Sequence, residues 1–345
     1  MKRIIKRKKT EPIKAVEPSL DSFPNFTKKE IFTQADLIYD LVDRLVKNDK
    51  ISLDYLKIKA DRIKRIYIIG AGIDYPAAII GAYNFEALVD VISIGMPMGE
   101  FLSSNPIIDK STLVVMLGEN EMAEKRVVDC QGILVKIVDF GDEKNTISLN
   151  HKTMGEFYTA GFSLRLIALF LLALYLGEKN KVITELYVKI AVTLMRGLKK
   201  NISGVLSKEF VINEIANALD FEHLSLVGTN VDYGVALYAS YIFGAVSDKP
   251  VTAYYLSQLP KQSQKNNSLI ALASCAELYD LIDTDLACAL KIVTNTIDDN
   301  SKNIFAFDES IPLLNPILCA VALQLIAYSK YMNAEERRNK NIKAP

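Results

Sequence analysis

IYIIGAGIDYPAAIIGAYNFEAL, residues 66–88, is the stretch that decides the fold. It opens with a short apolar run of the kind found in strands buried on both faces. Small residues then interrupt the run at Gly70-Ala71-Gly72, which suits a sharp turn. A helical pattern follows from Pro76, and proline is tolerated in the first turn of a helix. The stretch therefore predicts a strand, a turn and a helix.

The turn before such a helix is a possible anion site. Free backbone N–H groups at a helix N-terminus can bind a phosphate or another anion. Gly-x-Gly alone is a weak motif, because many parallel sheets use this turn without a ligand. Both interpretations stay open on this stretch alone.

The same pattern occurs a second time, at residues 226–246, as LVGTNVDYGVALYASYIFGAV. The two stretches align without a gap, and the shared strand-turn-helix pattern favours duplication over chance. Because the two copies lie a domain length apart, the repeat predicts two similar domains. The matching pairs are Gly70 and Gly228, Asp74 and Asp232, Tyr75 and Tyr233, Ala78 and Ala236, Tyr83 and Tyr241, and Phe85 and Phe243.

Length and composition agree with two domains. The chain has 345 residues, of which 50% are hydrophobic, enough for two sizeable cores. Its formal net charge is zero, so the whole chain has no bias toward nucleic acid or an anionic membrane. The longest apolar run, residues 164–176, contains Arg165 and is too short to span a bilayer. We therefore expect a core helix, a cytoplasmic protein and no membrane partner.

Cysteine and histidine usage gives no sign of a metal or cofactor. The four cysteines lack CxxC spacing, which favours reduced and mostly buried thiols. With two histidines in the chain, a His-rich metal site is not expected. We expect neither a metal nor a cofactor.

Patterning along the chain divides it into five segments. We expect a basic, disordered tail over residues 1–26, N-terminal helices over 27–63, a first domain over 64–183, linking helices over 184–220 and a second domain with a C-terminal tail over 221–345. For the tail, a solvated arm is favoured over a patch that touches RNA, DNA or lipid.

Local patterns predict the elements of each segment. Thr27 and Glu30 fit a capping box at the start of a first helix, and a second helix is expected over 53–63. Strands are predicted at 67–69, 91–94, 112–117, 132–138, 224–227, 251–255 and 269–273. Helices are predicted at 121–129, 162–176, 184–206 and 316–331. Strands alternating with helices imply an α/β fold, with two doubly wound parallel sheets (αβα, flavodoxin-like) in tandem.

Several segments in this order resemble a known family. Lys29-Glu30-Ile31 opens the first helix, GMPMGEFL with Glu100-Phe101 precedes the third strand, and YTAGFSLRLIALFLLALYLGE closes the first domain. Together with the repeated turn and the C-terminal LQLIAYSKYMNAEERRNKNIK, they resemble the paired SIS (sugar isomerase) domains of glutamine–fructose-6-phosphate aminotransferase and related phosphosugar isomerases and deglycases. The resemblance covers nearly the whole chain after the tail.

The two loops that hold the sugar phosphate in this family depart from the family pattern. The first usually reads Gly-Cys-Gly-Thr-Ser, and here it reads Gly-Ala-Gly-Ile-Asp from Gly70 to Asp74. The second usually reads Ser-Gln-Ser-Gly-Glu-Thr, and here no hydroxyl side chain remains. The carboxylates that stand in these loops are those of Asp74, Glu119 and Glu121. Like charges about 4 Å apart repel by about 1–4 kcal/mol at intermediate dielectric, so these three side chains disfavour a bound dianion. The ligand-binding candidates that the resemblance implies in these loops are Gly70, Gly72, Asp74, Gly118, Glu119, Asn120 and Glu121.

The family's catalytic groups are also displaced. Its enolising glutamate falls at Ala245 or a neighbour, and residues 241–246 contain no acid. Its ring-opening histidine falls near Lys261, and the lysine of its C-terminal tail falls within one residue of Lys343. The resemblance therefore implies Lys261 and Lys343 as further ligand contacts, and we assign no catalytic residue.

Simpler roles compete with these assignments. Asp74 and Asp232 are expected to be helix N-caps more often than ligand contacts. Glu119 and Glu121 fit exposed acids at a helix start, where the dipole favours them. His151 and His223 fit ordinary surface or loop histidines, and Lys261 fits a solvated loop lysine.

Three function classes remain open. The first is a non-catalytic SIS protein that binds a sugar phosphate or an amino sugar, with reduced or lost isomerase activity. The second is an active isomerase, deaminase or deglycase. The third, a transcription regulator, has only the basic tail in its favour. We expect a homodimer or a heterodimer with an SIS relative and no nucleic-acid partner. A glutamine amidotransferase half is not expected, because no cysteine nucleophile lies near Met1.

Overall fold

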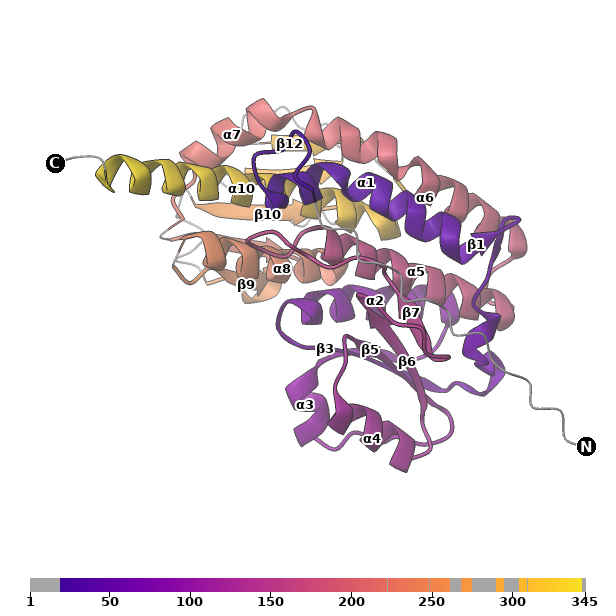
Figure 1. Ribbon diagram of the computed structural model, residues 1–345. Coiled ribbons are helices and arrows are strands. Elements are labelled where there is room, and N and C mark those ends of the chain that lie inside the picture. Colours follow the sequence, from indigo (N-terminus) through magenta and orange to yellow (C-terminus); the bar gives the residue numbers. More distant parts are fainter. Residues whose placement is uncertain are drawn as a thin grey trace, which may run out of the picture.

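Two parallel sheets of five strands each form the framework of the protein (Figure 1). The computed structural model describes residues 19–221, 223–247, 249–260, 268–274, 290–294, 304–308 and 310–342. The first sheet contains β3 (Arg65–Gly70), β4 (Ser93–Pro97), β5 (Thr112–Leu117), β6 (Ile133–Val138) and β7 (Thr146–Ser148). The second contains β8 (Ser225–Gly228), β9 (Thr252–Tyr255), β10 (Leu269–Ala273), β11 (Leu290–Thr294) and β12 (Ile304–Phe307).

The two sheets have the same strand order. It is β4-β3-β5-β6-β7 in the first and β9-β8-β10-β11-β12 in the second, and all neighbouring strands are parallel. This is the flavodoxin-like order, in which the connections reverse direction between the first and third strands. The predicted α/β fold with two such domains in tandem is confirmed.

Alternation along the strands explains why the first sheet is covered on both faces. Ile66 and Ile68 pack with the helices on one face, α2 (Tyr75–Val89) and α5 (Ala160–Lys179). Tyr67 and Ile69 point to the other face, where they meet α3 (Met98–Ser103) and α4 (Glu121–Asp129). Successive side chains of a strand point to opposite faces, so a strand that is apolar at every position is buried on both.

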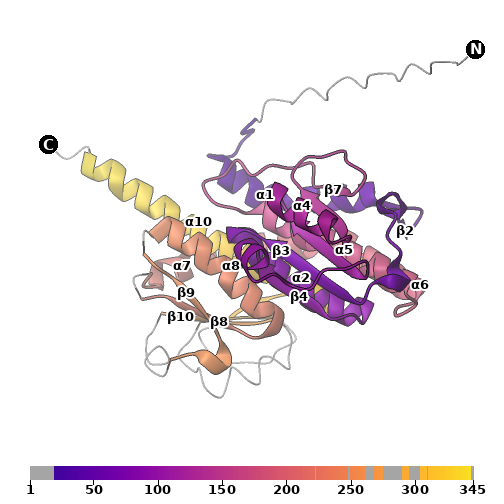
Figure 2. The ribbon, with the colours of Figure 1, turned by 90° about the horizontal axis from the view of Figure 1, so that it is seen from below.

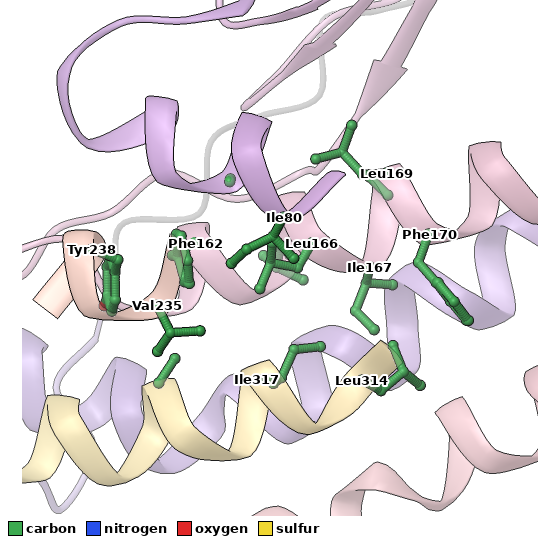
Figure 3. Close-up of a cluster of buried hydrophobic side chains, with 14 of the residues drawn as sticks. Ile80, Phe162, Leu166, Ile167, Leu169, Phe170, Val235, Tyr238, Leu314 and Ile317 are labelled. Carbon is green, nitrogen blue, oxygen red and sulfur yellow. The ribbon is translucent and has the colours of Figure 1, made fainter. Parts of the chain in front are cut away.

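A layer of helices between the sheets joins the two domains into one core (Figure 3). It consists of α2 and α5 from the first domain with α8 (Asn230–Ser247) and α10 (Asn315–Ile342) from the second. Phe162 on α5 stacks on Tyr238 on α8, with ring centroids 3.8 Å apart. Gly234 allows α8 to approach α2, because a Cβ there would lie 2.5 Å from Ile80 Cγ1.

Helices α1, α6 and α7 lie outside this layer, on the side of the second domain (Figures 1 and 2). α1 (Phe26–Leu45) packs against α5 and α6 (Glu185–Leu206), and α7 (Glu209–Ala218) packs against α10. Within the described part of the chain, two helical segments are long and apolar enough to cross a membrane, α5 and Pro312–Glu335, but 100% and 89% of their most apolar 18-residue stretches are buried inside the protein. Burial of α5 agrees with the predicted core helix.

The N-terminal predictions need two corrections. α1 begins after Asn25, whose side chain caps Lys28 N, and not at a capping box of Thr27 and Glu30. The second helix expected over 53–63 is wrong. In its place are the 3-10 turns η1 (Asp54–Leu56) and η2 (Ala60–Arg62), and an antiparallel pair, β1 (Val46–Lys47) and β2 (Lys50–Ile51), precedes them. Asn48 and Asp49 both have positive φ, as a two-residue hairpin turn requires.

Other differences are smaller. β4 lies two residues later than expected, β7, β11, β12 and α7 were not predicted, and Cys130 is exposed whereas Cys319 is buried. Most of the basic tail lies outside the described residues.

Candidate functional site

The turn after the first strand has the same geometry in both domains. A Cβ on Gly70 would lie 2.7 Å from the backbone carbon of Asp74, and a Cβ on Gly228 would lie 2.5 Å from that of Asp232. Glycine is therefore required where the chain folds back on itself. Two residues later, Gly72 and Asn230 both have positive φ, at 51° and 49°.

The second loop, between β5 and α4, lies beside the first at the carboxyl edge of the first sheet. Gly118 has φ of 91°, and Asn120 caps α4 by accepting a hydrogen bond from Ala123 N at 3.0 Å. Glu119 and Glu121 are exposed, as the simpler interpretation predicted. Because the connections reverse direction between β3 and β5, these loops flank the crevice where doubly wound sheets bind ligands.

A buried cation beside the second loop is already neutralised. Lys136 on β6 is only 3% exposed, and its Nζ lies 2.7 Å from Glu143, 3.3 Å from Glu124 and 3.8 Å from Glu119. Three carboxylates surround one ammonium group, so this loop presents a net negative charge to a ligand.

A second cation is neutralised beside the first loop. Arg165 on α5 is 6% exposed, and its Nε lies 2.8 Å from Asp74 Oδ1 while its Nη2 lies 3.1 Å from Asp139 Oδ1. Its guanidinium also lies over the ring of Tyr158, 5.1 Å from the centroid. Asp74 occupies the predicted N-cap position of α2, but its side chain makes no capping hydrogen bond there. The carboxylate instead points to Arg165.

Burial changes the protonation of Asp74. Desolvation raises the pKa of this carboxyl group to about 6, against the opposing attraction of Arg165, and Asp139 raises it further. A carboxyl group with a pKa near 6 changes charge close to neutral pH and can give or take a proton there.

The segment before α5 is held by Glu30 of α1. Its Oε1 accepts hydrogen bonds from Met154 N at 2.5 Å and Gly155 N at 3.3 Å, and its Oε2 accepts one from the Thr159 hydroxyl at 2.6 Å. His151 lies in the same region, in the loop before α5, and is half-buried; its loop position agrees with the expected surface or loop histidine. Burial lowers the pKa of His151, while the nearby Glu30 and Asp139 act in the opposite direction.

The second domain places an acid at the equivalent turn. Asp232 is fully buried inside α8, and its Oδ2 accepts a hydrogen bond from Ser274 N at 2.8 Å. Its predicted N-cap role is wrong. Desolvation raises the pKa of Asp232 to about 6, although the hydrogen bonds from Ser274 lower it. Among the described residues, neither Asp232 Oδ1 nor Thr229 Oγ1 has a hydrogen-bond partner.

The other predicted positions divide into two groups. Ala245 lies exposed on α8, and residues 241–246 around it carry no acid. Lys261 and Lys343 lie outside the described residues, so their predicted contacts stay predictions.

Sequence reasoning missed the roles of Asp139 and Lys136. It noticed Arg165 as a charge within an apolar helix but not its partners; a charge at such a position is seldom buried without one.

Sequence comparison finds related proteins that match most of this chain. No family model matches the sequence. The chain is 23% identical over 346 aligned residues to glutamine–fructose-6-phosphate aminotransferase (isomerizing) of Clostridium acetobutylicum, covering 91% of this chain and 57% of that protein. It is 25% identical to the Clostridium perfringens protein of the same name, covering 92% of this chain and 58% of that protein. The chain thus spans somewhat more than half the length of these relatives.

Solved structures show the same fold. The C-terminal domain of glucosamine-fructose-6-phosphate aminotransferase from Francisella tularensis superposes with a TM-score of 0.84 at 16% identity, covering 92% of this chain and 98% of that chain. Tagatose-6-phosphate ketose/aldose isomerase from Escherichia coli superposes with a TM-score of 0.69 at 12% identity, covering 92% and 96%. The shared strand order, these structures and the sequence relatives above together support an SIS sugar-isomerase protein with two parallel-sheet domains in tandem.

Proposed function

We propose that this protein binds a carbohydrate derivative, with an amino sugar preferred to a sugar phosphate, at the carboxyl edge of its first sheet. We further propose that it has lost most or all isomerase activity. One observation carries the proposal: Arg165 is already paired with Asp74 and Asp139 at the turn where relatives of this fold are expected to hold a phosphate.

Charge at the site favours an amine over a dianion. Arg165 and Lys136 are each surrounded by carboxylates, and Glu119 and Glu121 add exposed acids on the second loop. A phosphate would compete with these carboxylates for the two cations. An ammonium group would instead gain attraction, because opposite charges about 4 Å apart attract by about 1–4 kcal/mol.

The missing base supports loss of isomerisation. Enolisation needs a group of suitable pKa within hydrogen-bond reach of the C–H proton, and Ala245 supplies none. General base catalysis contributes about 10²–10⁴-fold to a rate, so its loss alone makes turnover slow.

Calorimetric titration tests the binding proposal. Glucosamine and glucosamine 6-phosphate are compared with N-acetylglucosamine, which lacks the ammonium group, and with fructose 6-phosphate, which lacks an amine. We expect glucosamine to bind more tightly than the two ligands without an amine. The double variant Glu119→Gln/Glu121→Gln should weaken it, whereas Glu214→Gln, an exposed acid on α7, should leave it unchanged. Tightest binding of fructose 6-phosphate would contradict the proposal.

A second candidate is an enzyme with altered chemistry, such as an amino-sugar phosphate deaminase, deglycase or isomerase. The raised pKa of Asp74 favours it, because a carboxyl group that titrates near pH 6 can act as a general acid or base. NMR with glucosamine 6-phosphate and fructose 6-phosphate in deuterated water distinguishes the two. Turnover or deuterium incorporation near 1 s⁻¹, about the low end of ordinary enzymes, would favour the enzyme if Asp74→Asn abolished it.

Assembly is part of the proposal. A homodimer, or a heterodimer with an SIS relative, predicts a mass near twice 38.5 kDa by light scattering after size exclusion. A monomer at micromolar concentration would contradict the homodimer.

A further inference from the structure

A pocket of about 250 Å³ lies between the two domains, on the side of α2 that faces β4 and β9. Tyr75, Ile79, Tyr83 and Glu86 recur at helical spacing and form one face of α2. Tyr255 reaches the pocket from the end of β9. The carboxylate of Asp74 instead pairs with Arg165 on α5, so this pocket is separate from the candidate site described above.

Three phenol rings line this tyrosine pocket. Tyr255 is fixed by stacking on Tyr233, with ring centroids 3.6 Å apart and an angle of 18° between the planes. Burial, together with the neighbouring phenols Tyr83, Tyr233 and Tyr75, raises the pKa of Tyr255 to about 12. The ring is therefore uncharged at neutral pH. The face of an uncharged aromatic ring carries a negative quadrupole that attracts cations.

One carboxylate completes the lining. Glu86 Oε1 accepts a hydrogen bond from Ser93 N at 3.2 Å, which orients the acid beside the rings. No Lys, Arg or His belongs to the lining among the residues that the structure describes. The pocket thus combines three aromatic side chains, one negative charge and no compensating cation.

We propose that the tyrosine pocket binds a small organic ammonium ion, such as a quaternary or primary alkylammonium group. Several tyrosines around one acid form the kind of cage that recognises quaternary ammonium ligands. Residues from both domains contribute, so bound ligand would link the domains. The proposal does not depend on the function proposed for the carboxyl edge, and either can fail alone.

Calorimetric titration of the full chain with choline chloride, at constant ionic strength, tests the proposal. The comparison ligand is 3,3-dimethylbutan-1-ol, which has the shape of choline without its charge. Glu86→Gln removes the charge but keeps an acceptor for Ser93 N, and Tyr83→Leu removes a ring. The matched controls are Glu185→Gln and Tyr187→Leu on α6, away from the pocket. Circular dichroism confirms that each variant is folded.

We expect saturable binding of choline to the parent protein. The neutral ligand should bind the parent at least about tenfold more weakly, and choline should bind both pocket variants at least about tenfold more weakly. A cation–π contact and a counter-ion each contribute on that scale. The controls should bind choline as the parent does. Equal affinity for the neutral ligand, unchanged affinity of Glu86→Gln, or no saturation up to about 10 mM would overturn the proposal.

Discussion

Replacement of Asp232 by asparagine should remove a pH-dependent loss of stability. The folded pKa of this carboxyl group is raised from 3.8 to about 6, since it is fully buried and has one hydrogen-bonded oxygen. Between these two pKa values the folded protein binds more protons than the unfolded chain, so stability falls as pH rises through this window. A shift of about 2 pKa units corresponds to a loss of about 3 kcal/mol, fully present above pH 7.

The assay is urea unfolding at pH 5 and at pH 8. Titration of Asp232 lowers the free energy of unfolding of the parent by about 1.4 kcal/mol between these pH values, and the Asp232→Asn variant lacks this change. Comparing the two pH values cancels any pH-independent effect of the new amide. Asp142→Asn, at an exposed position, is the matched control and should keep the slope of the parent. If the stability of the Asp232→Asn variant changes with pH as the parent's does, the reasoning is refuted.

Three other predictions concern packing and charge. Arg165→Met should lower the free energy of unfolding by about 3 kcal/mol at pH 8, because it leaves two carboxylates without their cation. The loss should be smaller at pH 5, where Asp74 is protonated. Equal losses at both pH values in urea unfolding would contradict this. Phe162→Ala should lower the free energy of unfolding by about 3–5 kcal/mol, because it removes the ring that stacks between the domains. Urea unfolding measures this loss, and a value below about 1 kcal/mol would argue against a shared core. Gly234→Ala should destabilise the protein by about 1–3 kcal/mol by forcing α2 and α8 apart. Gly197→Ala, with no atom within 4 Å of the new Cβ, should instead stabilise it by about 0.5–1 kcal/mol. Equal shifts of the two variants' thermal unfolding temperatures would contradict the close approach of the helices.

The predicted fold follows from local patterns. The apolar runs at 67–69 and 112–117 were recognisable as buried strands because nearly every position is apolar, and both lie in the interior of their sheet. The short strand β7 and the hairpin after α1 were missed. Three-residue strands carry too little periodicity to detect, and the Asn48-Asp49 turn signal lay within a stretch that otherwise suited a helix.

The candidate site was predicted less completely. The loops at Gly70–Asp74 and 118–121 were found, because glycine at a strand end is a local signal. The partners of Asp74 were not found, since Arg165 and Asp139 lie far from it in the sequence. Glu30 was assigned to a capping box from its spacing to Thr27, yet it holds backbone N–H groups of a segment more than a hundred residues later.

The sequence by itself determined the tandem α/β framework and the position of both turns, because strand, turn and helix signals depend on residues next to one another in the chain. Only the tertiary structure decided which charges neutralise one another and which tyrosines meet between the domains. Those contacts join residues from different elements, and a side chain's partners depend on how whole helices and sheets pack. Burial then sets the pKa of Asp74 and Asp232, because the cost of desolvating a charge depends on everything that surrounds it.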